Sequence, residues 1–136
     1  MYEAELMEYF TMQRPDYTAL PKILESMNKD GGFTLSSLVR SDGLSIASAV
    51  SPGMDKDVVA AVSSFITDSA ERVRKELMLG EIRDISLRCT EGKAVFKKIG
   101  RSSGALILAA VMPKSVRYHS RPIGKAATKI RRLMRA

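Results

Sequence analysis

Apolar residues recur along the chain with two different periods, and the changes of period predict where helices give way to strands. Spacing of three and four residues predicts helices over residues 3–13, 18–28, 55–79 and 122–134. Short β-prone runs between turn residues predict strands over residues 33–39, 44–50, 81–90, 93–99 and 105–112. The order is two helices, two strands, a long helix, three strands and a final helix. Such a mixture predicts one α+β domain.

The segment from Gly32 to Ser48 is the most informative stretch of this pattern. Two apolar runs flank Asp42 and Gly43. An Asp-Gly pair favours a two-residue type I′ turn because both central positions of that turn need positive φ. We therefore expect a tight β-hairpin here.

The helix predicted over residues 55–79 has an unusually broad apolar surface. Asp55 and Asp57 lie in its first turn, where acidic groups favour the helix dipole, and Gly80 follows its end. One apolar stripe consists of Val58, Val62, Phe65, Ser69, Val73 and Leu77. Further apolar or small residues widen it, namely Val59, Ile66, Ala70 and Met78. We expect this helix to pack on its own sheet and on a second surface; burial within its own domain alone is the alternative.

The three later strands differ in how much they are expected to be buried. In residues 81–90, Ile85, Leu87 and Cys89 alternate with polar neighbours, which is typical of a strand with one covered face. Residues 105–112 are apolar almost throughout, so this strand belongs in the middle of the sheet with both faces covered. Thr18 is the expected N-cap of the second helix.

Charge is distributed unevenly within a net charge of +7. Residues 1–17 hold four acidic residues and one basic residue, whereas residues 81–136 hold fourteen basic residues and three acidic ones. The basic half suggests an acidic partner, a nucleic acid or an anionic membrane surface. No signal peptide or membrane span is predicted, so we expect a cytoplasmic protein.

Residue types that carry catalysis are sparse and poorly placed. His119 is the single histidine and Cys89 the single cysteine, which excludes an internal disulfide and a His/Cys metal site. Gly124 and Lys125 lack the other residues of a phosphate-binding loop. Gly31 and Gly32 precede a strand, unlike a dinucleotide-binding fingerprint. We expect no enzymatic activity, no catalytic residue, no metal, no cofactor and no small-molecule substrate.

The basic residues after position 96 have two interpretations. They could line a phosphate-binding surface on which Tyr118 stacks a base, or they could form a solvated charged face. The residues concerned are Lys97, Lys98, Arg101, Lys114, Arg117, Arg121 and Lys125.

Two segments resemble the Roadblock family of dynein light chains and small-GTPase regulators, which is related to longin domains. They are the hairpin GFTLSSLVRSDGLSIAS (32–48) and the long helix DKDVVAAVSSFITDSAERVRKELMLGEI (55–82). The resemblance implies a five-stranded antiparallel sheet in strand order 2-1-5-4-3, with the long helix on one face and the terminal helices on the other. It covers residues 18–136 as one domain and leaves residues 1–17 as an accessory N-terminal helix.

The resemblance also implies a function through protein contacts. It implies a homodimer, in which the third strands pair edge to edge and the long helices lie side by side, that regulates or scaffolds a Ras-like small GTPase. Candidate dimer contacts are Ile82, Asp84, Ser86, Arg88, Val59, Ile66 and Ala70. Candidate partner-binding residues are Asp57, Ala61, Ser64, Asp68, Glu71, Arg72 and Lys75.

Two alternatives to a GTPase regulator stay open at this point. A basic adaptor would hold nucleic acid or an anionic membrane surface through Lys125, Lys129, Arg131 and Arg132. A longin-like subunit of a motor or trafficking complex would instead depend on other subunits of that complex.

Overall fold

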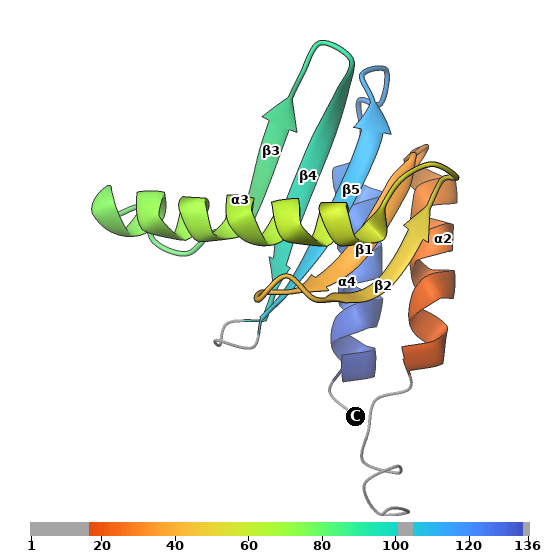
Figure 1. Cartoon of the computed structure of the whole chain (residues 1–136), viewed down its shortest axis with the longest axis horizontal. Coiled ribbons are helices and arrows are strands. Elements are labelled where there is room, and N and C mark those ends of the chain that lie inside the picture. The colour runs from red at the N-terminus through yellow and green to blue at the C-terminus, as the bar shows by residue number, and fades with distance from the viewer. Residues whose placement is uncertain (1–16, 101–104, 135–136) are drawn as a thin grey trace, which may run out of the picture.

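A computed structural model describes residues 17–100 and 105–134 of the chain (Figure 1). Its elements are a 3-10 helix η1 (Tyr17–Ala19), α2 (Leu20–Gly31), β1 (Leu35–Arg40), β2 (Ser45–Val50), α3 (Lys56–Glu76), β3 (Asp84–Arg88), β4 (Gly92–Ile99), β5 (Leu106–Pro113) and α4 (Ser120–Met134). The helix predicted over residues 3–13 lies outside the described residues. The boundary of the domain at residue 18 therefore stays a prediction.

The five strands form one antiparallel sheet in the order β2-β1-β5-β4-β3. This order confirms the predicted topology. β5 is the central strand, and all its residues from Leu106 to Ala110 are buried, as its apolar run predicts. Figure 1 shows α3 crossing one face of the sheet, while α2 and α4 lie together behind the other face.

The larger of two hydrophobic cores lies between the sheet and the pair α2 and α4. Leu20, Leu24 and Met27 of α2 meet Ile123 and Ile130 of α4 over the strands. All five side chains are at most 3% exposed. This core fixes both terminal helices on the same face of the sheet.

The second core, under α3, is much smaller. It consists of Val39, Ala60, Phe96, Ile107 and Ala109, with Ile66, Ile85 and Ala94 packed at its margin. α3 therefore buries few of its large apolar side chains against its own sheet.

The hairpin between β1 and β2 has a longer loop than the predicted two-residue turn. The Gly43 amide donates to the Arg40 carbonyl, and the Arg40 amide donates to the Leu44 carbonyl, so the loop has three residues. Gly43 has φ of 93°, whereas Asp42 is not among the positive-φ residues. The type I′ prediction is wrong because one left-handed glycine after an ordinary turn closes this loop with a bulge.

The start of α2 differs from its prediction, whereas the start of α3 agrees with it. α2 begins after Ala19 and has no side-chain cap, so Thr18 is not its N-cap. Pro21 in the first turn has no backbone N–H, so one fewer amide at this end of the helix needs a hydrogen-bond partner. In α3, by contrast, Asp55 is the N-cap, and its carboxylate accepts a hydrogen bond of 2.9 Å from the Asp57 amide.

Candidate functional site

α3 places small and hydroxylated side chains against the sheet. Ala60, Ser63 and Thr67 are its buried residues. Ser63 Oγ donates to the Val59 carbonyl at 2.6 Å, and Thr67 Oγ1 donates to the Ser63 carbonyl at 2.8 Å. Because both hydroxyls donate hydrogen bonds within the helix, α3 lies close to the sheet without leaving a buried hydroxyl unpaired.

The opposite face of α3 carries large apolar side chains that are open to solvent. We call Val58, Val62, Phe65, Ser69 and Val73 the outer stripe. Its four apolar members are 57%, 46%, 71% and 50% exposed in chain order. Helical spacing puts them about 180° from the buried residues of α3. The predicted stripe is therefore a surface of α3 that faces away from the sheet, and the helix packs on its own sheet, as expected, through its smaller residues.

One sequence pattern does indicate which side of α3 faces the sheet, namely the row Ala60, Ser63 and Thr67. Residues of this size at helical spacing favour close approach of a helix to a sheet, so the bulkier row on the other side is left outside. Hydrophobicity alone ranks the bulkier row first for burial and does not show which row faces the sheet.

The apolar surface continues past the end of α3. Figure 1 shows the second half of α3 projecting beyond β3, so that it extends past the edge of the sheet. Leu77, Met78 and Leu79 follow the helix and are 64%, 89% and 66% exposed. Contiguous exposed apolar surface of this kind is typical of a protein interaction site.

β3 is an edge strand with an unpaired side. The Cys89 amide donates to the Gly92 carbonyl across the hairpin to β4. Since bonded and non-bonded pairs alternate in an antiparallel ladder, Asp84, Ser86 and Arg88 form the non-bonded pairs and direct their own amides and carbonyls to the free edge. These three residues are among the predicted dimer contacts, and all three are exposed.

Three of the other predicted dimer contacts, Val59, Ile66 and Ala70, lie on α3 between its buried row and the outer stripe, and the fourth, Ile82, precedes β3. Val59, Ile66, Ala70 and Ile82 are half-buried within the single chain. Ile66 packs at the margin of the second core. In the predicted contact between the α3 helices of two copies, these residues would lie at the border and the outer stripe at the centre.

The predicted partner-binding residues share one flank of α3 but differ in availability. Asp57, Ala61, Asp68, Arg72 and Lys75 are exposed. The other two, Ser64 and Glu71, are engaged within the domain.

Ser64 and Glu71 hold α3 on the sheet. Ser64 Oγ donates to the Ser41 carbonyl at 2.8 Å. Glu71 accepts from Lys98 Nζ of β4 at 3.0 Å and from Arg74 Nε at 2.8 Å. The hydrogen bond from Lys98 and that from Arg74 lower the pKa of the Glu71 carboxyl against the opposing effect of its partial burial.

On the far face of the sheet, α4 presents its basic residues to solvent. Lys125, Lys129, Arg131 and Arg132 are all exposed, while Ile123, Ala126, Ala127 and Ile130 face the core. This confirms the predicted amphipathic helix with a basic outer side.

Within residues 17–100 and 105–134, no group of three His, Cys, Asp or Glu side chains is arranged to hold a metal ion. Over the same part of the chain, every helix is too short or too polar to span a membrane.

Solved structures with the same fold come from several bacteria. MglB of Myxococcus xanthus has a TM-score of 0.81 at 15% identity, covering 88% of this chain and 90% of MglB. A Roadblock/LC7 domain of Streptomyces avermitilis has a TM-score of 0.76 at 13% identity, covering 85% and 98% of the two chains. At these identities the likeness concerns the fold.

Sequence comparison identifies the family directly. Two uncharacterized proteins of Methanocaldococcus jannaschii are each 30% identical to this chain over 81 residues, which is 60% of this chain and 71% of theirs. The sequence profile of the Roadblock/LC7 domain matches residues 21–110, from α2 to the middle of β5. The chain therefore belongs to the Roadblock/LC7 domain family.

Proposed function

We propose that this chain is a homodimeric binding module, without catalysis of its own, that regulates or scaffolds a Ras-like small GTPase. The observation that carries the proposal is the outer stripe of α3, where Phe65 is 71% exposed although the domain has a complete core on the other face of the sheet. Burial of such a stripe against a second copy removes apolar surface from water.

One twofold axis would satisfy both unpaired surfaces at once. Two identical strands pair antiparallel when the axis runs perpendicular to the sheet between them. Such an axis keeps both copies of α3 on the same face of a continuous ten-stranded sheet. Because α3 projects past β3, its outer stripe would reach the α3 of the second copy (Figure 1). Pairing of the β3 edges would satisfy the amides that Asp84, Ser86 and Arg88 leave open.

The GTPase assignment is supported by family membership together with the surface of α3. The Roadblock resemblance implies binding of Ras-like small GTPases. In the proposed dimer, the exposed flank residues Asp68, Arg72 and Lys75 of each copy stay outside the helix contact and remain open to solvent. We propose this charged flank as the GTPase contact.

Binding to purified GTPases tests this assignment. Small Ras-like GTPases from the same genome would be loaded with GDP or with a non-hydrolysable GTP analogue, and their affinity for the chain measured by calorimetry. Arg72→Glu should weaken binding by about tenfold or more, because it reverses a charge at the centre of the contact. Lys129→Glu, on α4, makes the same charge change and should leave affinity within about twofold.

The effect on the GTPase cycle would be measured with the same proteins. A change in the rate of GTP hydrolysis or of nucleotide exchange would identify a regulator, and binding without a rate change would identify a scaffold. Absence of binding to every such GTPase in either nucleotide state, by a chain shown to be folded and dimeric, would refute the assignment.

A further inference from the structure

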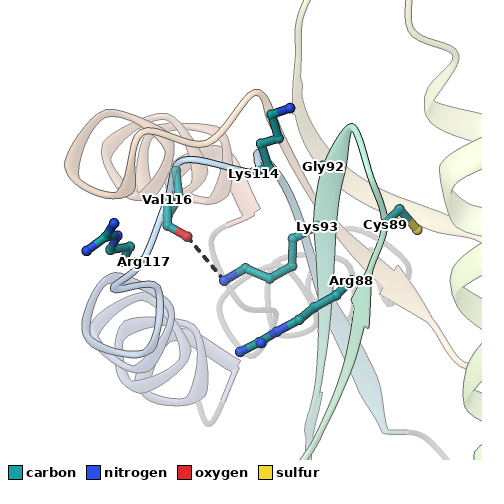
Figure 2. Close-up of a pocket in the computed structure, with 7 residues that line it drawn as sticks. All are labelled: Arg88, Cys89, Gly92, Lys93, Lys114, Val116 and Arg117. Atoms are coloured by element: carbon teal, nitrogen blue, oxygen red, sulfur yellow. Dashed lines mark hydrogen bonds between the residues drawn. The ribbon is translucent and has the colours of Figure 1, made fainter.

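A basic cleft lies at the end of the β3–β4 hairpin, on the face of the sheet that α2 and α4 cover. Its volume is about 310 Å³, and four cationic side chains line it, namely Arg88, Lys93, Lys114 and Arg117. Figure 2 shows Arg88 and Lys93 extending side by side from adjacent strands toward the segment between β5 and α4, where Lys114 and Arg117 stand at the rim. No Asp or Glu is among the residues that line it.

The backbone forces two of these cations together. Arg88 of β3 lies directly opposite Lys93 of β4 in the antiparallel ladder. They form a non-bonded pair, the kind in which facing side chains are closest. Like charges in this position are unfavourable. A bound anion between them would turn that repulsion into attraction.

Polar partners among the residues that the structure describes leave most of this charge unmatched. Lys93 Nζ donates to the Val116 carbonyl at 3.2 Å, which occupies one of its three N–H donors. Nearby His119 has its pKa lowered, first by partial burial and then by the positive charge of Lys93 and of Arg88, with Asp84 opposing. The charges of Lys93 and Arg88 thus reach the imidazole of His119.

We propose that this cleft binds a ligand that carries a phosphate monoester or diphosphate group. Two adjacent cationic side chains, Arg88 and Lys93, with two more at the rim and no carboxylate in the lining, suit a multiply charged phosphate, which offers several acceptor oxygens. The volume accommodates a pyrophosphate-sized group, while a larger ligand would extend into solvent through the open side of the cleft.

Gly92 and Cys89 line the cleft without directing a side chain into it. Gly92 contributes no side chain at the point where its strand lies beside Met112; a Cβ there would be 3.1 Å from the Met112 carbonyl oxygen. Cys89 borders the cleft through its backbone, and Figure 2 shows its side chain directed to the opposite side of β3. The side chains left to contact a ligand in the cleft are the four cationic ones and Val116.

This site goes beyond the proposed GTPase function and needs one copy of the chain only. The edge of β3 would pair through its backbone, whereas Arg88 enters the cleft through its side chain. Failure of the dimer and failure of phosphate binding are therefore separate results.

Pyrophosphate is the probe for the first experiment. The chain has one histidine, so the imidazole signals of His119 in proton NMR report on the region without labelling. Titration with pyrophosphate at a constant ionic strength of about 0.15 M should shift these signals saturably and should raise the pKa of His119, because a bound anion offsets the charge of Lys93 and Arg88.

Paired charge variants locate the binding. The double variant Lys114→Gln/Arg117→Gln removes two exposed cations of the rim and should weaken pyrophosphate binding by about tenfold or more. The double variant Lys125→Gln/Lys129→Gln removes the same charge from α4 and should change it by less than about twofold. The proposal would be overturned if both double variants weakened pyrophosphate binding equally. It would also be overturned if chloride at equal ionic strength displaced pyrophosphate, or if the His119 signals showed no saturable shift.

Two further binding experiments distinguish a soluble phosphate ligand from one at a membrane surface. Soluble ADP presents a diphosphate, and vesicles of phosphatidylcholine with phosphatidylinositol 4-phosphate present a monoester at a membrane surface. Binding to either that is lost in Lys114→Gln/Arg117→Gln supports the site and names its ligand class. Binding to neither, with pyrophosphate also inactive, refutes it.

Discussion

At the scale of single residues, Glu71 is the side chain that ties α3 to the sheet most directly. It joins Lys98 of β4 and Arg74 of its own helix in a partly buried cluster. Sequence analysis had placed Glu71 on a partner-binding surface because its position on the helix flank is compatible with either role. Its partner Lys98, on β4, is 27 residues away in the sequence, and no local sequence pattern indicates such a pair.

Replacement of Glu71 should therefore cost stability in a pH-dependent way. Glu71→Gln should lower the free energy of unfolding at pH 7 by about 1 kcal/mol, since it leaves Lys98 partly buried without its carboxylate. The pKa of Glu71 is lowered in the folded state, so its contribution is present above the unfolded pKa and is lost as the pH falls through the folded one.

Urea unfolding at pH 7 and near pH 3 measures this difference. The gap between wild type and Glu71→Gln should shrink on acidification. Glu76→Gln, an exposed change at the end of the same helix, should show a much smaller gap at both pH values. An equal effect of the two variants at pH 7 would contradict the structural role of Glu71.

His119 should give the stability of the fold a second pH dependence, in a pH range above that of Glu71. Because burial lowers its pKa in the folded state, its neutral form is favoured by folding, and stability is lost as the pH falls below the unfolded pKa of about 6.5. His119→Gln should flatten the dependence of stability on pH between about 7.5 and 5.5. Thermal unfolding at several pH values in that range checks it, and an unchanged slope would count against a depressed pKa.

At the scale of elements, the pattern of the chain predicted nearly every helix and strand of residues 17–134, because each follows local periodicity and turn residues. The exposed side of α3 could not be predicted in this way. Helical spacing shows that Val58 and Ala60 lie on different faces, but which face meets the sheet depends on packing between distant segments. The hairpin loop shows the same limit: Asp42 and Gly43 announced a turn, and its bulge depends on the register of β1 with β2.

Two glycine substitutions should have opposite effects on stability. Gly43→Ala should destabilise by about 1 kcal/mol, because φ of 93° is strained for any residue with a Cβ. Gly124→Ala lies within α4, where a Cβ would meet nothing within 4 Å, and should stabilise by about 0.5 to 1 kcal/mol. Chemical denaturation of both variants measures the pair; the same sign for both would contradict the backbone assignment.

The free edge of β3 supplies a test of strand pairing. Ser86→Pro removes an amide that points away from β4, so it should spare the hairpin and weaken the proposed dimer by about tenfold or more. Ser86→Ala keeps the amide and serves as its control. Analytical ultracentrifugation over a range of concentrations gives both affinities, and equal dimerisation of the two variants would exclude the β3 edge from the interface.

At the scale of the whole molecule, the two faces of the sheet carry different properties. The α2 and α4 face holds the main core, the basic outer side of α4 and the cleft at Arg88 and Lys93. The α3 face holds a small core and an exposed apolar surface. The two proposals use these faces separately: self-association would use the α3 face, and anion binding the face that α2 and α4 cover. Composition predicted the basic half of the chain, but it could not show that its charges gather beside β3.

The oligomeric state of the chain tests the central claim most directly. Light scattering coupled to size-exclusion chromatography should give twice the chain mass of 15.0 kDa for the wild type and for Lys22→Glu, an exposed change on α2. Phe65→Glu should give 15.0 kDa with unchanged circular dichroism, because it puts a charge into the outer stripe without touching either core. A wild-type monomer at about 100 μM, or a Phe65→Glu dimer as tight as the wild type, would contradict the account.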